Sequence, residues 1–512
     1  MSIRGAWLGV VILVGFFGAC SGDVLTRRMS SADAVGTGAQ ADTVLKLHLR
    51  DGGVVVMSNA RVDRSERFLI GRSVRYDVAR TVVGSGLDTV AFDDVALVES
   101  NTVSVPASLG GMAAMSTVSV IMTGFCMANP KACFGSCPTF YAWNGESMTL
   151  QAEGFSSSIA PVLRATDLDA LYRWKPRGRV VEIVMTNEAL ETHVVDHVEL
   201  RAVPRTDGGR VVAAAGGELF EAFDLRPVDR AIAAEGDVSA LLREYDARER
   251  VGLASEVDLA ERETIEIEFD SVPGGDVGLV VGFRESLMTT YLFYQGLAYL
   301  GSSAGAWIAR CERDSAAARA TLASMQRVLG GIEILVQNDA GEWSTAGAID
   351  EAGPIAQNLQ VVRLPQIPKA PLRLRLRMSK GLWRLDYLAI ARLGRQVEPI
   401  VLRPLDVRRD DAADTAALTA LLDPARSLVT TRGDRYTLRF ALPDDRDYEL
   451  FLESRGYYLE WMRTEWLAEE NPARAAQMFL MPAEFLRAEA PRFKAVEPSL
   501  EEQFWSSRYV RQ

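Results

Sequence analysis

The chain has 512 residues, too many for one hydrophobic core, and a length of roughly 150 residues per domain predicts about three domains. Hydrophobic residues make up 48% of the chain and charged residues 24%, a composition that excludes wholesale disorder. The formal net charge of −12 argues against a nucleic-acid-binding protein, because phosphate binding needs a concentrated basic surface.

The first twenty residues have the pattern of a signal peptide. Arg4 precedes an apolar run from Trp7 to Phe17, and small residues then lead to Cys20. The run is shorter than the roughly 20 apolar residues of a membrane-spanning helix. The stretch GFFGACSGD resembles the lipobox of bacterial lipoproteins, with Phe17 where leucine is usual. This resemblance implies cleavage before Cys20, lipidation of Cys20, export and, because Ser21 follows, an outer-membrane address. The alternative is an ordinary signal peptide with a chance cysteine.

Alternating apolar and polar residues, interrupted by turn residues, predict a mainly β protein that is α+β overall. We expect eight segments in chain order. They are a signal peptide at 1–19, a flexible tether at 20–42, a small antiparallel β domain at 43–100, an uncharged small-residue segment at 101–135, a β-sandwich-like domain at 136–283, a helical segment at 284–329, a second β-sandwich-like segment at 330–400 and a mixed α/β region with many aromatic residues at 401–512.

Three local features refine this division. Residues 105–125 carry no charge, and we expect a buried helix of small residues there, with a membrane-associated span as the alternative. Asn144 and Gly145 predict a two-residue type I′ turn that joins two strands. The stretch GYYLEWMRTEWLAEE, residues 456–470, predicts a helix in the C-terminal region.

Motifs that would indicate catalysis lack their partners. Residues 301–305, GSSAG, match the nucleophile elbow of hydrolases, but all three histidines of the chain precede Ser303, whereas that class needs a later one. His193 and His197 have a spacing that suits zinc on a helix, yet the valines around them favour a strand, in which the two side chains lie about 13 Å apart. We therefore expect no enzyme, no metal and no cofactor.

The cysteines predict a disulfide bond. Once Cys20 is assigned to lipid, an even number remains in an exported chain, where disulfides are permitted. Cys126 or Cys133 paired with Cys137 would tie the uncharged segment to the strand that follows, and Cys311 would then be a buried thiol. The spacing of Cys133 and Cys137 is not that of a redox C-x-x-C motif.

Tryptophans provide the candidate binding surfaces. Trp343 and Trp383 fall in the 330–400 segment, where exposed rings could stack on glycans. Trp461, Trp466 and Trp505 give the C-terminal region an aromatic composition that is typical of protein interfaces. Packing in the core is the alternative for each of these rings.

The segments CFGSCPTFYAWNG, ESLMTTYLFYQGLAYLG and GDRYTLRFALP resemble members of an uncharacterised family of bacterial lipoproteins. The resemblance implies an envelope location and a β-rich architecture, without an established activity. We therefore expect a lipid-anchored protein at the outer membrane, on its periplasmic or surface face, with a non-catalytic binding or scaffolding role and an envelope protein or glycan as partner. The alternative is a carbohydrate-binding or carbohydrate-processing surface lipoprotein.

Overall fold

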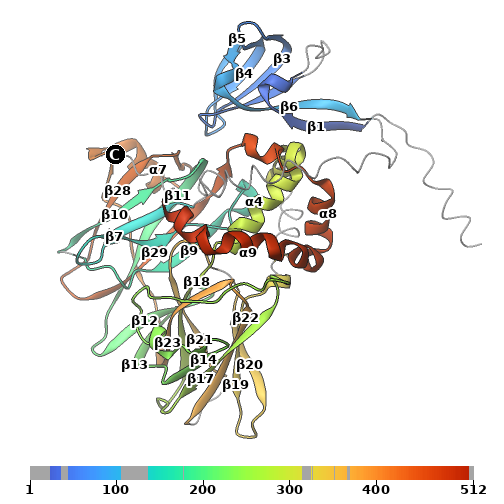
Figure 1. Ribbon diagram of the computed structural model, residues 1–512. Helices are drawn as coiled ribbons and strands as arrows, with labels where there is room; N and C mark the ends of the chain where they lie inside the picture. Colours follow the sequence, from blue (N-terminus) through green and yellow to red (C-terminus); the bar gives the residue numbers. More distant parts are fainter. Residues whose placement is uncertain are drawn as a thin grey trace, which may run out of the picture.

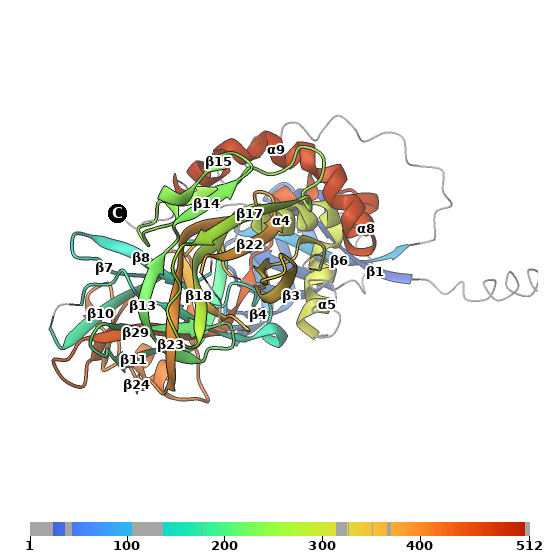
Figure 2. The same ribbon diagram turned by 90° about the horizontal axis from the view of Figure 1, so that it is seen from below.

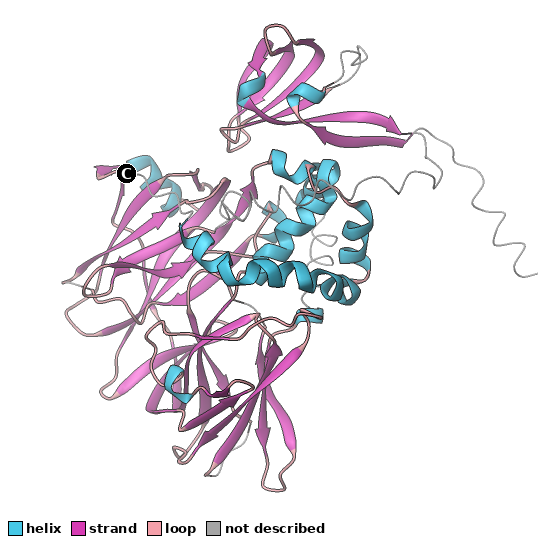
Figure 3. Ribbon diagram, viewed as in Figure 1, coloured by secondary structure: helices cyan, strands magenta, loops and turns pink. Residues whose placement is uncertain are grey.

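The computed structural model describes residues 24–35, 44–104, 137–176, 178–313, 325, 327–350, 352–365 and 370–506. These residues form an N-terminal sheet, two β lobes and a layer of helices (Figures 1 and 3). The prediction of a mainly β, α+β protein is confirmed. In Figure 1 the N-terminal sheet, in blue, lies at one end, with the helices between it and the second β lobe.

The N-terminal sheet is antiparallel throughout, in the order β1-β6-β2-β3-β4-β5. Its strands are β1 (Val24–Ser30), β2 (Leu45–Leu49), β3 (Val54–Asp63), β4 (Phe68–Tyr76), β5 (Val82–Ala91) and β6 (Val95–Ser104). The strand β1 belongs to the stretch that we expected to be a flexible tether. Its pairing with β6 supplies backbone hydrogen bonds that the local sequence pattern does not reveal.

The first β lobe contains two facing sheets around one apolar core. One sheet holds β7 (Thr139–Trp143), β8 (Met148–Glu153), β10 (Val180–Thr186), β25 (Asp406–Arg409), β26 (Ala412–Ala413) and β28 (Arg435–Ala441). The other holds β9 (Ala165–Ala170), β11 (Glu191–Pro204), β24 (Ile400–Leu402), β27 (Leu428–Thr430) and β29 (Tyr448–Glu460). Helix α7 (Thr415–Leu422) covers the core at one side.

The second β lobe also contains two sheets. One holds β12 (Gly209–Ala214), β13 (Leu219–Pro227), β16 (Arg250–Val251), β18 (Val277–Glu285), β21 (Asn358–Arg363) and β23 (Trp383–Val397). The other holds β14 (Arg230–Ala233), β15 (Gly236–Asp237), β17 (Arg262–Phe269), β19 (Ile332–Gln337), β20 (Trp343–Ile349) and β22 (Leu372–Ser379). Because β13 pairs with both β12 and β23, five strands of the first sheet form a closed ring of pairings.

The lobes are assembled from stretches far apart in the chain, which differs from the contiguous domains that we expected. Strands between residues 139 and 204 pair with strands between 400 and 460. Strands between 209 and 285 pair with strands between 332 and 397. The expected 136–283 domain is therefore divided between the two lobes, because alternation identifies a strand but not its partner.

Five longer helices are described: α4 (Met288–Leu300), α5 (Ala304–Arg313), α8 (Pro472–Leu480), α9 (Pro482–Ser506) and α7. Figure 2 shows α8 and α9 curving past α4. The helix predicted over 456–470 is wrong: β29 continues to Glu460, and a short 3₁₀ helix follows at Thr464–Leu467. Among the described residues, none of the helices has both the length and the apolar character of a membrane span. The uncharged residues 105–125 lie outside the described residues.

The hairpin at Asn144 and Gly145 is present, but its turn differs from the prediction. Trp143 pairs with Met148, so the connection has four residues rather than two. The Oδ1 atom of Asn144 accepts hydrogen bonds from the backbone N–H groups of Glu146 and Ser147, each at 2.9 Å. This side-chain turn replaces the type I′ geometry that the dipeptide predicts.

Candidate functional site

A cavity of about 450 Å³ lies between helix α4 and the first β lobe. Its walls come from α4, α5 and α8, from the loop after β8, from the end of β29 and from residues 352–355, which precede β21. The volume falls within the range of roughly 300–1,000 Å³ that is usual for small-molecule sites.

The long wall of the cavity is apolar. Helix α4 has the sequence MTTYLFYQGLAYL, which has no charged residue and therefore presents apolar side chains on most of its surface. Phe293, Leu297 and Leu300 of this helix line the cavity. Trp307 of α5 and Phe479 of α8 complete the wall with stacked rings, whose centroids are 5.8 Å apart.

The packing of α8 against α4 depends on Gly296. A Cβ atom at this position would lie 2.7 Å from the Sδ atom of Met478, so a larger residue would push the helices apart. After Phe479, Leu480 and Met481 expose 78% and 46% of their surface. The apolar wall therefore continues, next to Phe479, into apolar side chains that face solvent.

The opposite end of the cavity carries neutral polar groups. Cys137, Ser156, Tyr294 and Tyr458 line it. The Tyr458 hydroxyl donates to the carbonyl oxygen of Ser156 at 3.2 Å, and the Tyr294 hydroxyl donates to Glu460. Burial raises the pKa of the Cys137 thiol and of both phenols well above their ordinary values. These groups keep their protons at neutral pH, so this end offers O–H and S–H groups without charge.

A buried carboxyl lies behind Tyr294. Burial, opposed by the charge of Arg463 and supported by that of Glu191, raises the pKa of Glu460 to about 8. The Nη2 atom of Arg463 lies 2.9 Å from Oε2 of Glu460, and its guanidinium lies over the Tyr294 ring at 5.2 Å. The polar end is therefore held in place by side chains from α4, from β29 and from the loop that follows β29.

A second buried carboxyl holds the loop on the far side of the cavity. The Oε2 atom of Glu153 accepts the backbone N–H of Ile355 at 2.9 Å, and its Oε1 atom occupies the space that a side chain on Gly353 would need. Burial, followed by the charge of Asp167, raises the pKa of Glu153 to about 8. Pro354 and Ile355 line the cavity, so Glu153 positions one of its walls.

The arrangement favours binding over covalent chemistry. The nucleophile of a cysteine is its thiolate, and Cys137 holds its proton in this environment. None of the described lining residues is a histidine that could act as a base for it. Glu285 is the acidic residue among the described lining residues, and none of these residues is cationic. An apolar wall with neutral hydrogen-bonding groups beside Tyr294 and Tyr458 suits a ligand with a long apolar part and a small polar head without negative charge.

The GSSAG stretch connects two helices instead of forming an elbow between a strand and a helix. Residues 301–303 form a 3₁₀ turn between α4 and α5. The backbone N–H of Ser302 donates to Glu470 at 2.9 Å, and Arg28 of β1 donates to both Ser302 and Glu470, at 2.5 and 2.6 Å. A Cβ atom on Gly305 would lie 1.9 Å from Oε1 of Glu99 in β6. The motif therefore attaches the N-terminal sheet to the helices.

His193 and His197 lie in strand β11, as the valines predict, but they do not share a face. A bulge between Val195 and His197 places Val195 opposite Gly456 and His197 opposite Arg455. The extra residue reverses the side-chain alternation, so that His193 and His197 point to opposite faces of the sheet. His193 is fully buried, whereas His197 is partly exposed. The two histidines cannot hold one metal ion.

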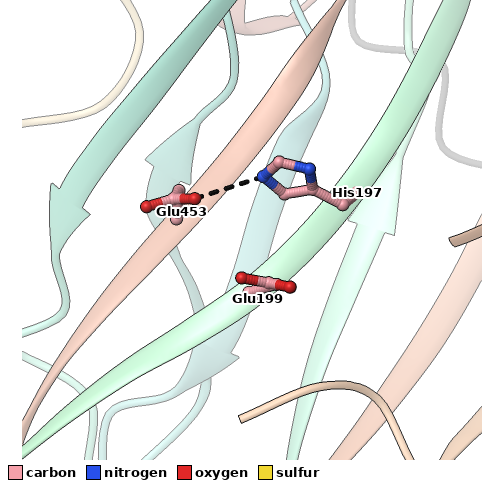
Figure 4. A group of neighbouring side chains, drawn as sticks. All are labelled: His197, Glu199 and Glu453. Carbon is pink, nitrogen blue, oxygen red and sulfur yellow. Dashed lines mark hydrogen bonds and ion pairs between the residues drawn. The ribbon is translucent and has the colours of Figure 1, made fainter. Parts of the chain in front are cut away.

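His197, Glu199 and Glu453 form a group that has the spacing of metal ligands (Figure 4). Nε2 of His197 lies 3.2 Å from Oε1 of Glu453. Arg201 contacts both carboxylate oxygens of Glu453, with its Nε atom 2.8 Å from Oε2. The Nη2 atom of Arg201 also lies 3.3 Å from Oε2 of Glu199. The other oxygen of Glu199, Oε1, lies 3.2 Å from Nε of Arg403. The guanidinium groups already neutralise both carboxylates, so the group is a surface ion-pair network.

The two tryptophans expected to stack on glycans are differently placed. Trp383 is 1% exposed in the main core, beside Phe283, so it cannot form part of an exposed surface. Trp343 is half-buried, and the Arg375 guanidinium covers its ring at 4.1 Å from the centroid. The structure brings neither ring to an open face.

The C-terminal tryptophans contribute mainly to packing. Trp466 is 3% exposed and belongs to the core, which contradicts a surface role. Trp461 is half-buried, and its Nε1–H donates to Oγ1 of Thr192 at 2.8 Å. Trp505 is also half-buried, packs against the main core and donates to Oε2 of Glu501 at 3.0 Å. These three rings do not form one surface for a partner.

The predicted disulfide is not formed in the part of the chain that the structure describes. Cys137 is a buried thiol, 6% exposed, and no disulfide joins it to Cys311, the other cysteine that the structure describes. Its side chain belongs to the core of the first β lobe. Cys311 is buried in α5. Cys20, Cys126 and Cys133 lie outside the described residues.

No protein-family model and no curated protein matches this chain. Among solved structures, it is similar to BuGH86wt in complex with neoagarooctaose at 11% identity and a TM-score of 0.16, over 47% of this chain and 35% of that one. A substituted form of BuGH86 with the same oligosaccharide matches at 11% identity and a TM-score of 0.15, over 45% of this chain and 33% of that one. The match spans about a third of those proteins, and at these TM-scores it bears on neither fold nor function.

Sequence reasoning identified Cys137 for another role and missed the rest of the cavity. Its residues come from β18, α4, α5, α8, β29 and several connecting segments, so no spacing rule connects them. One signal was available: a helix without charge that is too short to span a membrane needs apolar neighbours along its whole surface.

Proposed function

We propose that this protein is a lipid-anchored protein of the bacterial envelope with a non-catalytic binding role, and that its ligand is an amphipathic molecule with one alkyl chain. The observation that supports this proposal is the cavity beside α4, which joins an apolar wall to an uncharged polar end. Each buried CH₂ group gains about 0.8 kcal/mol, so a ten-carbon chain gains on the order of 8 kcal/mol before the cost of association.

The polar end favours a hydroxyl head group over a carboxylate. The thiol of Cys137 can donate a hydrogen bond without charge, and the phenol oxygens of Tyr294 and Tyr458, whose hydrogens go to Glu460 and Ser156, can accept one. A carboxylate placed there would be desolvated, and none of the described lining residues is a cation that could pair with it. A monoacylglycerol or a long-chain alcohol is therefore the expected class of ligand.

The location of the protein rests on the lipobox resemblance. A diacyl anchor at Cys20 would hold the cavity close to a membrane, which is a source of alkyl chains. The carbohydrate alternative does not gain support from Trp343 or Trp383, since the first is covered by Arg375 and the second is buried.

Displacement of Nile red by 1-monolauroylglycerol tests the proposed ligand class with the full-length protein. We expect Leu300→Trp to weaken displacement at least tenfold, because the indole would fill space next to a half-buried lining residue. Leu87→Trp is the matched control, because Leu87 is 82% exposed in the N-terminal sheet.

Two results would contradict the proposal. One is unchanged displacement in Leu300→Trp when its melting temperature matches that of the original protein. The other is tighter binding of laurate than of 1-monolauroylglycerol at neutral pH, because an anionic head would be desolvated where none of the described lining residues is a cation.

A further inference from the structure

A second cavity, of about 340 Å³, lies between the two β lobes and shares no lining residue with the cavity beside α4. Its floor is apolar and comes from Val212, Val280 and Leu359 on strands β12, β18 and β21. Its walls carry three tyrosines and three arginines: Tyr172, Tyr245, Tyr387, Arg173, Arg210 and Arg243.

Strand register and a glycine shape this cavity. Gly282 lies opposite Leu359 in β21 and opposite Tyr387 in β23, so these two side chains share one face of the sheet with Val280. A Cβ atom on Gly282 would lie 2.9 Å from the Tyr245 ring. The absence of a side chain at this position therefore allows the Tyr245 ring to lie against the sheet.

The three tyrosine rings form a continuous edge-to-face series. The centroids of Tyr172 and Tyr245 are 6.4 Å apart, with an interplanar angle of 83°, and those of Tyr245 and Tyr387 are also 6.4 Å apart, at 67°. The hydroxyl of Tyr172 donates to the carbonyl of Val211, and that of Tyr245 donates to the carbonyl of Gln357 at 3.4 Å. These contacts fix the rings before a ligand binds.

The arginines of the cavity differ in how they are paired. Burial raises the pKa of the nearby Asp386 to about 6, and the charge of Arg173 opposes this rise. Arg210 is neutralised by Glu449, with Nη2 3.2 Å from Oε2. Arg173 donates to the carbonyl of Leu150 at 3.3 Å, and Arg243 donates to the carbonyls of Val228 and Asp229 at 3.1 and 2.6 Å. Within the part of the chain that the structure describes, neither Arg173 nor Arg243 forms an ion pair with a carboxylate. Glu244 is the acidic residue that lines the cavity, and it is exposed.

We propose that this second cavity binds an anionic saccharide, with the sugar carboxylate held by Arg173 and Arg243 and a ring face packed against Tyr387. The other two tyrosine rings complete the wall, since Arg210 lies over the Tyr172 ring at 4.6 Å and Arg173 lies over the Tyr245 ring at 5.8 Å. Guanidinium groups recognise carboxylates through paired, charge-assisted hydrogen bonds. Tyrosine rings pack against the apolar faces of other rings and keep a hydroxyl for polar contacts. In a chain with a net charge of −12, a concave site with two arginines that lack carboxylate partners is suited to an acidic ligand.

Calorimetric titration of the full-length protein with trigalacturonic acid at low salt tests the proposal. We expect Arg173→Gln and Arg243→Gln each to weaken binding roughly 10- to 100-fold, because each removes a hydrogen bond between charged groups. Arg363→Gln should leave the affinity unchanged, since Arg363 is exposed, contacts Asp276 and lies outside the cavity. Higher salt should weaken binding to the original protein.

Three results would overturn this inference. They are no binding of trigalacturonic acid, equal affinity for a neutral galactose trimer, and equal affinity for citrate, which carries carboxylates without a sugar ring. Thermal unfolding of each variant separates loss of the site from loss of the fold. Leu300→Trp should bind trigalacturonic acid normally, so failure of the alkyl-ligand proposal does not affect this result.

Discussion

Replacing Glu153 by glutamine should change how the stability of the protein depends on pH. Burial raises the pKa of Glu153 from 4.5 to about 8, so the folded protein keeps a proton on this carboxyl at neutral pH. Unfolding exposes the carboxyl, which then releases the proton. Since the unfolded state binds fewer protons between these two pKa values, the free energy of unfolding falls as the pH rises through this window.

The size of the effect follows from linkage. One proton changes the free energy of unfolding by about 1.4 kcal/mol per pH unit, so Glu153 should lower it by about 2–3 kcal/mol between roughly pH 5.5 and 7.5. Glutamine resembles the protonated acid, and its carbonyl oxygen can still accept the hydrogen bond from the backbone N–H of Ile355. Glu153→Gln should therefore lack this part of the pH dependence.

Urea unfolding followed by tryptophan fluorescence at the two pH values measures the effect. Glu261→Gln is the control, because the hydrogen bonds with Lys380 and Ser255 lower the pKa of Glu261. Glu261 therefore does not titrate in the window, and its variant should keep the original slope. The reasoning is refuted if Glu153→Gln and the original protein lose the same free energy between the two pH values.

Three further predictions concern other parts of the chain. Cys20→Ala should move the protein from the membrane fraction to the soluble fraction, and unchanged retention would point to residues 105–125 as a membrane span. Cys137 should react with iodoacetamide only after unfolding, because its thiol is buried and its pKa is raised. Mass spectrometry locates the label, and rapid labelling of Cys137 in the folded protein would contradict this placement. Asp414→Ala should destabilise the protein by about 1 kcal/mol in urea unfolding, because the side chain of Asp414 caps α7 by accepting the backbone N–H of Ala417 at 2.9 Å. Asp339→Ala, at an exposed position, is the control, and an equal loss of unfolding free energy in the two variants would argue against the cap.

The strand and helix types could be predicted where the local pattern is strong. The alternation in Leu45–Leu49 and Val54–Asp63 and the uninterrupted apolar character of Met288–Leu300 indicated the elements that form. Prediction failed at Gly456–Glu460, where β29 pairs with β11 along its whole length. Long-range pairing outweighs the helical preference of Leu, Glu and Met in that stretch.

By itself, the sequence determined the β-rich class of the fold and the positions of many strands, since these follow from side-chain periodicity and turn residues. Only the tertiary structure decided which strands are neighbours, that Cys137 is a buried thiol and that Trp383 is enclosed. Both cavities depend on residues from several separate elements. Pairing and burial are long-range properties, set by which apolar faces meet when the chain folds, and no local pattern contains that information.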